Sequence, residues 1–423
     1  MKQLLILVIA SVMLPGCSNG SEMKIKPDSN NGGLILPDGF SAIVVAEDLG
    51  RGRHITVKDN GDIYVSLRRL NEGNGAVALR DTTGDGRADV VKYFGSVSGT
   101  GIELHNGYLY YGVDSMIVRY AFENQNDLLP REEYEVIAGQ LVDEGQHASK
   151  PFEFDGEGNM YVTIGAPSNA CMEQMRTKGS SGMDPCPILD YAGGIWRFSE
   201  HQNDQTQEKD GYRYATGIRH AVALRWNDKT EKLYTVQHGR DQLHQFFPEI
   251  YDTEASAELP AEEFLMLEDG ADFGWPYCYY DQIQETKVLA PEYGGDGSKI
   301  GRCETKTDPI MAFPGHIAPN DLVFYHAKQF PAKYQNGAFI AFHGSWNRAP
   351  EPQEGYNVTF VPFDGDLPSG DWETFADGFS QLEMVQNPGD AVYRPCGLSV
   401  GPDGSLYVVD SRQGKVWRIF YNG

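Results

Sequence analysis

Several chemical signatures are missing from this sequence. It contains no glycine-rich nucleotide-binding loop, no Cys-x-x-Cys-His haem attachment site and no cysteine and histidine spacing typical of zinc. No long segment repeats its apolar residues with the 3.6-residue period of a helix. These absences argue against a nucleotide-, haem- or zinc-dependent enzyme and against a largely helical fold.

Basic residues are also scarce, since 35 Lys and Arg face 60 Asp and Glu, which gives a formal net charge of −25. An acidic surface repels nucleic acids and anionic membranes, so we expect no nucleic-acid partner. The 48 glycines and 23 prolines favour a β architecture with many turns. A chain of 423 residues forms two or three ordinary domains or one large repetitive all-β domain.

The N-terminus carries the one conspicuous apolar run. "MKQLLILVIASVMLPGC" has a lysine, an apolar stretch too short to span a membrane, and a Leu-Pro-Gly-Cys motif that resembles a bacterial lipobox. We predict a lipoprotein signal peptide at 1–16 and a lipidated Cys17 that begins a flexible tether over 17–38. The protein is then a periplasmic or outer-surface lipoprotein that meets the membrane only through its lipid. Plain secretion and an uncleaved anchor are the alternatives.

Five cysteines remain after Cys17, and an exported protein can keep disulfides. Cys171 and Cys186 flank a Gly/Ser-rich loop and are one plausible pair, and Cys278 and Cys303 are another. Cys396 is then left over as a small buried residue. Spacing alone does not fix this connectivity.

One short pattern recurs along the chain: an apolar strand, a turn containing Gly, Asn or Asp, and a second strand with a central aromatic residue. The second strands begin near Ile63, Leu109, Met160, Leu233, Phe339 and Leu406. Six such hairpins, each followed by further strand-like sequence, predict a six-bladed β-propeller with four-stranded antiparallel blades over residues 39–423. The longest gap, 241–320, is expected to hold loop insertions on one face. Two stacked β-sandwiches are the alternative.

Arginines and histidines recur just before or after these hairpins, where a propeller presents loops to its central channel. A cluster of arginines in an acidic protein suits a small ligand with several negative charges, because guanidinium groups pair with carboxylates in a bidentate manner. A histidine among them suits a general base. The set comprises Arg53, His147, Arg219, His220, His343, Asn347, Arg348 and Arg394.

Eight segments carry a family resemblance, in order from about residue 36 to the C-terminus: "LPDGFSAIVVAEDL", "RHITVKDNGDIYVS", "DTTGDGRADVV", "HASKPFEFDGEGNMYVTIG", "GIRHAVALRW", "FGWPYCYYD", "AFHGSWNR" and "RPCGLSVGPDGSLYVVD". Together they resemble the soluble quinoprotein sugar dehydrogenases of the glucose/sorbosone dehydrogenase family, closest to its L-sorbosone and pyranose dehydrogenase-like branch. The resemblance implies a six-bladed propeller that oxidises an aldose or related sugar at C1 with pyrroloquinoline quinone (PQQ) and calcium. It also implies a cytochrome or quinone as electron acceptor.

The resemblance further implies roles for individual residues. His147 matches the histidine that takes the proton from the sugar C1 hydroxyl. Calcium is expected on the backbone carbonyls of Gly239 and Arg240. The family has an Arg-Asn pair at the position of Arg219 and His220, so His220 differs from the family's asparagine. The expected cofactor-binding residues are Arg53, Arg219, His220, His343, Trp346, Asn347, Arg348 and Arg394.

Three points stay open. Trp346 either stacks on the flat quinone or a sugar ring, or packs between blades at a tight turn. "DTTGDGRAD" resembles a calcium loop, but Lys92 stands where an EF-hand has glutamate, so we expect an Asx/Gly turn. The alternative functions are a calcium-dependent lactonase or other hydrolase, and a non-catalytic propeller that binds carbohydrate or protein.

Overall fold

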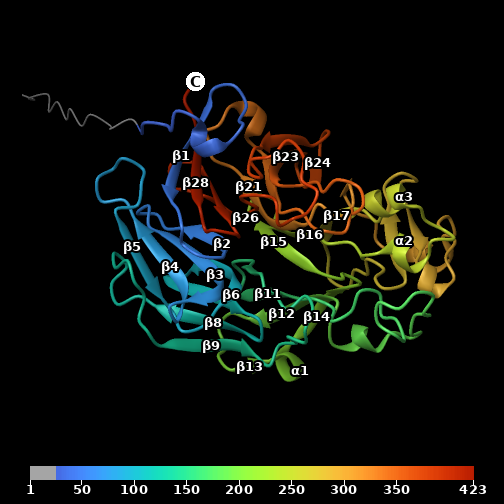
Figure 1. The fold of residues 1–423 in the computed structure, drawn as a ribbon. Helices are drawn as coiled ribbons and strands as arrows, with labels where there is room; N and C mark the ends of the chain where they lie inside the picture. Colours follow the sequence, from blue (N-terminus) through green and yellow to red (C-terminus); the bar gives the residue numbers. More distant parts are fainter. Residues whose placement is uncertain (1–24) are drawn as a thin grey trace, which may run out of the picture.

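The computed structural model describes residues 25–423, and it is almost entirely β. Within these residues the strands form six sheets of four or five strands and one two-stranded hairpin. The six sheets surround a common axis as blades (Figure 1). The predicted six-bladed β-propeller is therefore confirmed. The predicted signal peptide and Cys17 lie outside the described residues.

The first three blades take up the N-terminal half of the chain. From the axis outwards, the first contains β2 (Gly52–Val57), β3 (Ile63–Asn71), β4 (Asn74–Arg80) and β5 (Val90–Phe94). The second contains β6 (Gly99–His105), β7 (Tyr108–Val113), β8 (Met116–Ala121), β9 (Tyr134–Gly139) and the short parallel strand β13 (Gln205–Thr206). The third contains β10 (Phe152–Phe154), β11 (Asn159–Ile164), β12 (Gly194–Ser199) and β14 (Tyr212–Thr216).

The last three blades follow in the same order. The fourth contains β15 (Ala221–Asn227), β16 (Lys232–Gln237), β17 (Glu262–Leu267) and β20 (Met311–Phe313). The fifth contains β21 (Pro319–Tyr325), β22 (Gly337–Phe342), β23 (Asn357–Asp364), β24 (Leu367–Pro368) and β25 (Glu373–Ala376). The sixth contains β26 (Pro395–Val400), β27 (Leu406–Asp410), β28 (Val416–Tyr421) and β1 (Phe40–Ala46).

The ring is closed by the two ends of the chain. β1 pairs antiparallel with β28, and Figure 1 shows the blue N-terminal strand beside the red C-terminal one. This pairing leaves no gap between the first and the last blade, so the ring has few free strand edges. The innermost strands β2, β6, β10, β15, β21 and β26 contact one another around the axis.

The predicted hairpins supply the first two strands of every blade, and β3, β7, β11, β16, β22 and β27 are their second strands. The turn between β6 and β7 shows the expected chemistry. His105 pairs with Tyr108, and the two residues between them, Asn106 and Gly107, have φ of 48° and 79°. Positive φ at both positions is the requirement of a type I′ hairpin, which Asn-Gly meets at little cost.

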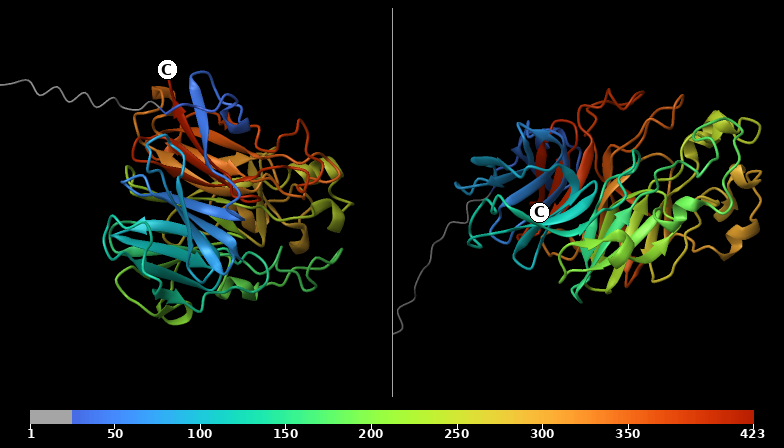
Figure 2. Two further views of the ribbon diagram at one scale, coloured as in Figure 1. Left: turned by 60° about the vertical axis from the view of Figure 1, so that its left-hand side comes forward. Right: turned by 90° about the horizontal axis from the view of Figure 1, so that it is seen from below.

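The insertion in the fourth blade is smaller than predicted. Residues 241–320 include β17 and β20, which are regular strands of that blade. The true insertions carry α2 (Leu243–Phe246), α3 (Thr253–Glu258) and the hairpin β18 (Cys278–Asp281) and β19 (Thr286–Leu289). They project together on one side of the propeller, in yellow and orange in the right-hand view of Figure 2.

Both predicted disulfides form, Cys171–Cys186 and Cys278–Cys303. Within the described residues Cys396 is unpaired and buried, as expected. The first disulfide closes the loop between β11 and β12, and the second joins β18 to the 3-10 helix Gly301–Thr305. The first therefore fastens the long loop of the third blade, and the second fastens the 3-10 helix to the β18–β19 hairpin.

Part of the segment that we expected to be a tether packs on the propeller. Leu34 is buried in the apolar cluster of the fifth and sixth blades, and Ile35 forms a β-bridge with Asp377. Asp28 forms an ion pair with Arg87 at 2.6 Å. Among residues 25–423 no helix is both long and apolar enough to cross a membrane.

The "DTTGDGRAD" segment forms a turn held by its own aspartates. The Asp81 carboxylate accepts hydrogen bonds from the backbone N–H of Thr83, Gly84 and Gly86. Asp89 accepts from the backbone N–H of Thr82 at 2.8 Å. Both carboxylates thus act as Asx-type acceptors, which is the turn we expected.

Candidate active site

Three histidines lie together at one end of the channel, on loops that join neighbouring blades; we call His147, His220 and His238 the histidine group. The rings of His147 and His220 stack with centroids 4.5 Å apart, and His238 lies 4.9 Å from His220. His147 Nδ1 is hydrogen-bonded to the Ala166 carbonyl, which can only accept. Nδ1 therefore carries the proton in neutral His147, and Nε2 keeps its lone pair.

The histidine group is neutral at physiological pH. Burial, followed by the charge of Arg219, lowers the pKa of His147 to about 3. Burial likewise lowers the pKa of His238 to about 4 and that of His220 well below its usual value. Because an imidazole must be unprotonated to accept a proton, this environment keeps His147 in the form that a general base requires.

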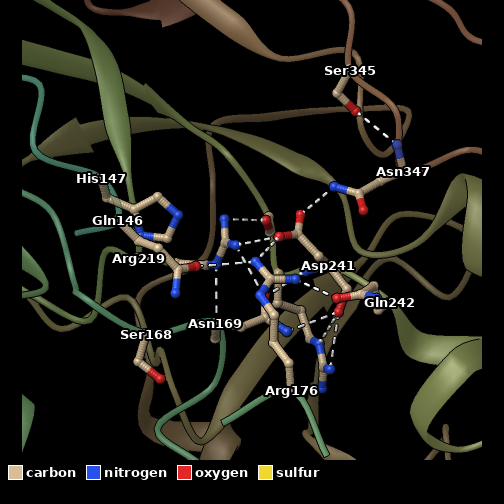
Figure 3. Close-up of polar contacts among 12 residues, drawn as sticks. Gln146, His147, Ser168, Asn169, Arg176, Arg219, Asp241, Gln242, Ser345 and Asn347 are labelled. Carbon is tan, nitrogen blue, oxygen red and sulfur yellow. Dashed lines mark hydrogen bonds and ion pairs between the residues drawn. The ribbon is translucent and has the colours of Figure 1, made fainter. Parts of the chain in front are cut away.

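A network around Asp241 ties four loops together (Figure 3). The Asp241 carboxylate accepts hydrogen bonds from Arg219 and Arg176, each at 2.7 Å, and from the Asn347 side chain. Burial alone would raise the pKa of Asp241, but Arg219, His316 and Arg176 hold it below the usual range. The carboxylate thus remains charged and fixes Arg219 and Asn347 in place.

Most hydrogen-bond donors of the Arg219 guanidinium group are engaged in this network. It donates to the Asn169 carbonyl and side chain, to the Gly239 carbonyl at 2.9 Å and to Asp241. Four of the five guanidinium N–H groups are therefore engaged within the protein. Arg219 positions the loop that carries Gly239 more than it offers a free charge to a ligand.

Five other arginines surround a cavity of about 400 Å³, which we call the arginine cavity. Two of the five, Arg53 and Arg394, were predicted to bind a cofactor, as was His343, which also lines it. No Asp or Glu stands among its lining residues. The arginines are Arg51, Arg53, Arg68, Arg394 and Arg412.

Most of these guanidinium groups have no counter-ion. Within residues 25–423, Arg68 pairs with Asp114 at 2.8 Å, and the other four have no carboxylate within ion-pair distance. Arg394 and Arg412 donate to backbone carbonyls, and the buried Nε of Arg53 has no hydrogen-bond partner in the described part of the chain. Four uncompensated positive charges in one cavity repel one another, so the cavity is suited to a ligand with several negative charges.

The arginine cavity and the histidine group belong to one site. The charge of Arg53 contributes to lowering the pKa of His220, His238 and His343. His343 Nδ1 donates to the Gly344 carbonyl, so its Nε2 accepts a hydrogen bond from the Ser411 hydroxyl at 2.6 Å. These contacts bring residues from the first, third, fourth, fifth and sixth blades to the same end of the channel.

Other predicted residues are placed differently. Arg348 is buried and donates to the Ala257 and Gly315 carbonyls and to Glu258, which attaches its loop to α3. Arg240 forms a buried ion pair with Glu292, in which its Nη1 donates to both carboxylate oxygens at 2.5 and 2.6 Å. The side chains of both arginines thus hold the insertion of the fourth blade, outside the arginine cavity.

Trp346 is 50% exposed, so it does not pack between blades. Of the predicted calcium ligands, the Gly239 carbonyl accepts from Arg219 and keeps one lone pair for another partner. Across residues 25–423 no three His, Cys, Asp or Glu side chains are grouped as metal ligands, so a calcium ion would depend on backbone oxygens.

Sequence reasoning missed Arg51, Arg68 and Arg412. Arg51 is two residues before Arg53, Arg68 lies within β3, the second strand of the first hairpin, and Arg412 follows β27, the second strand of the sixth. The position just after a hairpin was a usable signal, because it had already pointed to His343. Asn169 and Arg176 lie in the irregular loop between β11 and β12, where no periodic pattern marks them.

Carboxylates also converge in the channel, but around an arginine. Glu103, Glu153 and Asp321 lie on inner strands of three blades and surround Arg225 at 3.2, 3.0 and 3.8 Å. Burial raises the pKa of Glu153 to about 8. This group is occupied by Arg225 and closes the channel through ion pairs.

Two curated proteins resemble just under half of this chain. A PQQ-dependent pyranose dehydrogenase of Coprinopsis cinerea is 26% identical over 231 residues, which are 48% of this chain and 30% of that protein. An uncharacterized protein of Borreliella burgdorferi is 26% identical over 208 residues, which are 49% of this chain and 48% of that protein. The matched segments therefore span about half or less of these curated relatives.

Solved structures match almost the whole chain. The holo form of the pyranose dehydrogenase PQQ domain from Coprinopsis cinerea has a TM-score of 0.72 at 18% identity, covering 92% of this chain and 97% of that one. The calcium structure of Trichoderma reesei carbohydrate-active enzymes family AA12 has a TM-score of 0.72 at 15% identity, covering 95% and 99%. These likenesses establish a shared fold. A family model described as TrAA12-like matches residues 34–422, and the chain belongs to that family.

Proposed function

We propose that this protein is a quinoprotein oxidoreductase that oxidises an aldose or related sugar at C1 with PQQ and calcium. The observation that carries the proposal is the arginine cavity, with four guanidinium groups that lack a carboxylate partner among residues 25–423. Support also comes from the family, whose relatives include a PQQ-dependent pyranose dehydrogenase.

The residues of the cavity fit such a cofactor. PQQ carries three carboxylates, and Arg53 and Arg394, which line the cavity, would pair with them. The orphaned Nε of Arg53 gives it an unused donor. Arg51 and Arg412 are more exposed, and they add charge at the rim. Asn347 and His220 carry buried polar atoms without a partner in the described residues, and a bound cofactor can supply partners for both.

Calcium would be held by the carbonyl oxygens of Gly239 and Arg240, since oxygen donors suit this ion. When bound, PQQ supplies a two-electron acceptor and calcium supplies a Lewis acid beside it. The network of Arg219 and Asp241 keeps the Gly239 loop in a fixed position for this purpose.

His147 has the geometry of the general base. Its Nδ1–H is held by the Ala166 carbonyl, which aligns the ring and leaves Nε2 to receive the proton of the C1 hydroxyl. His220 supports the ring by stacking. The family carries Asn where His220 stands, and the stacked imidazole gives this departure a defined role in positioning His147.

Titration of the purified protein with PQQ, with and without calcium, tests the proposal. We expect saturable, calcium-dependent changes in the quinone absorbance and a higher melting temperature, because a ligand that binds only the folded state stabilises it. Oxidation of aldoses is then measured with an artificial electron acceptor. Absence of PQQ binding in folded protein would exclude the dehydrogenase function and leave a lactonase or a binding propeller.

The proposal also includes the electron acceptor of the protein and its location in the cell. Electrons would pass to a cytochrome or quinone, and the protein would be held at a periplasmic or outer-surface membrane by a lipid on Cys17. Labelling of the wild-type protein with a radioactive fatty acid, compared with Cys17→Ala, tests the anchor. Equal labelling of both proteins would exclude Cys17 as its site.

A further inference from the structure

A second cavity lies beside the fifth blade, outside the arginine cavity. Its volume is about 410 Å³, and we call it the tryptophan cavity because Trp372 stands at its rim. Its walls come from the loop between β22 and β23, the start of β23, and the segment that follows β25. Tyr356 lies between the two cavities, since it lines this one and its ring faces the Arg394 guanidinium 5.7 Å away.

The lining of the tryptophan cavity combines an aromatic face with hydrogen-bonding groups and contains no Lys, Arg or His. Trp372 is 37% exposed, and its indole packs edge-on against Phe313. Glu354 and Asp377 supply carboxylate oxygens, and Asn357 supplies a side-chain amide. An aromatic plane beside polar groups is the chemistry that recognises sugars, whose rings have an apolar face and a polar edge.

Buried polar atoms in the wall lack partners. Gln353 is only 5% exposed, and its backbone is fixed by a β-bridge to Val385. Its Nε2 donates to the Glu351 carbonyl, but its Oε1 has no partner within residues 25–423. The buried hydroxyl of Tyr356 is equally unpaired in that part of the chain. An unsatisfied buried polar atom costs about 1–3 kcal/mol, so a ligand that hydrogen-bonds in this cavity gains from satisfying them.

The charges of the lining residues limit the kind of ligand that the tryptophan cavity can bind. Three carboxylates without a basic neighbour in the lining disfavour an anion such as PQQ. Glu354 is already paired with Arg348 at 3.1 Å, and Asp377 accepts a hydrogen bond from the Gly378 N–H, so neither requires a cationic ligand. The third carboxylate, that of Glu383, belongs to an exposed residue, so water can solvate it. We propose that the tryptophan cavity binds a neutral saccharide and thereby holds a carbohydrate chain beside the central site.

Calorimetric titration with cellotetraose, maltotetraose and xylotetraose tests this site in the full-length protein, with and without PQQ. We expect saturable binding of at least one tetrasaccharide. Trp372→Ala should weaken it tenfold or more, and Asn357→Ala about fivefold, since loss of one neutral hydrogen bond costs about 1 kcal/mol. Tyr212→Ala, which removes another exposed aromatic residue on the third blade, should leave the affinity unchanged.

The outcomes separate this inference from the proposed function. Because saccharide affinity is measured in cofactor-free protein, it does not depend on whether PQQ binds. Failure of all three tetrasaccharides to bind folded wild-type protein would overturn the inference. So would an unchanged affinity in Trp372→Ala, or loss of binding in Arg53→Ala alone, which would place the sugar in the arginine cavity. Binding of tetralysine in place of every saccharide would also overturn it, since it would identify a cation site.

Discussion

The molecule has two neighbouring cavities of nearly equal size and opposite chemistry. The arginine cavity measures about 400 Å³ and has five arginines and no acid in its lining, whereas the tryptophan cavity measures about 410 Å³ and has three acids and no base. Tyr356 of the tryptophan cavity faces Arg394 of the arginine cavity, so the two cavities are neighbours at this point. In a chain with a net charge of −25, the arginine cavity is the exception, and its charge suits the anionic cofactor of the proposed function.

The two cavities are built on similar scaffolds. In the arginine cavity Arg53 and Arg68 lie on strands β2 and β3, and the other lining residues lie on loops. The tryptophan cavity is also lined mainly by loops, with three residues on β22 and β23. The difference between the cavities therefore lies in the charge of their side chains, and both are built from loops, where binding residues are common.

The largest expected effect belongs to His147. His147→Ala should lower the turnover rate about 10²–10⁴-fold, which is the usual contribution of a positioned general base. PQQ affinity should change little, because His147 lies outside the arginine cavity lining. Both quantities are measured on one preparation, by steady-state rates with an artificial acceptor and by absorbance titration.

The matched control for this variant is His201→Ala, because His201 is a largely exposed histidine on an outer turn of the third blade. That variant should turn over at the wild-type rate. If His147→Ala also retains a rate within a few-fold of wild type, another group is the base.

The comparison of the cavities is tested most directly by Arg53→Ala and Trp372→Ala. Arg53→Ala should weaken PQQ binding about 10–100-fold, since a hydrogen bond between charged groups contributes about 1.5–3 kcal/mol. Trp372→Ala should leave PQQ binding unchanged. Arg53→Lys should recover part of the affinity, because it restores the charge without the bidentate fork. Equal losses of PQQ affinity in Arg53→Ala and Trp372→Ala would show that the cavities do not act separately.

The sequence predicted the fold because each hairpin carries its own local signal of two alternating strands and a glycine or asparagine turn. It predicted Arg53, His147 and Arg394 because they stand next to such hairpins. The sequence also predicted Arg348 in the ligand site, but this side chain points to α3 instead. A position in the sequence shows which residues are neighbours along the chain, and it does not show the direction of a side chain. The tryptophan cavity left no trace, since its walls are loops brought together only by the tertiary fold.

Added salt should weaken ligand binding in the arginine cavity more than ligand binding in the tryptophan cavity. Raising the ionic strength from about 0.05 to 0.5 M shortens the Debye length from roughly 14 to 4 Å, so partly exposed charges at the cavity mouth are screened. PQQ affinity should fall about three- to tenfold. The affinity for a neutral tetrasaccharide should change less than twofold, because it depends on stacking and neutral hydrogen bonds. Titrations in a low-salt and a high-salt buffer measure both affinities. Equal losses of the two affinities would contradict the assignment of an anionic ligand to one cavity and a neutral ligand to the other.

The smallest expected change is in kcat/KM on the acidic side of its pH profile. An ordinary histidine with a pKa near 6.5 would be about 97% protonated at pH 5, and a rate that depends on its neutral form would fall about 25-fold from pH 7. Burial and Arg219 lower the pKa of His147 to about 3, so His147 stays neutral down to at least pH 5. We therefore expect kcat/KM to change less than twofold between pH 7 and pH 5. Because kcat/KM reports groups of the free enzyme, a limb near pH 6.5 would mean that burial and the charge of Arg219 do not lower the pKa of the base. Replacing Arg219 by glutamine removes the nearest of those charges and should move the limb upwards, towards the value of a free imidazole.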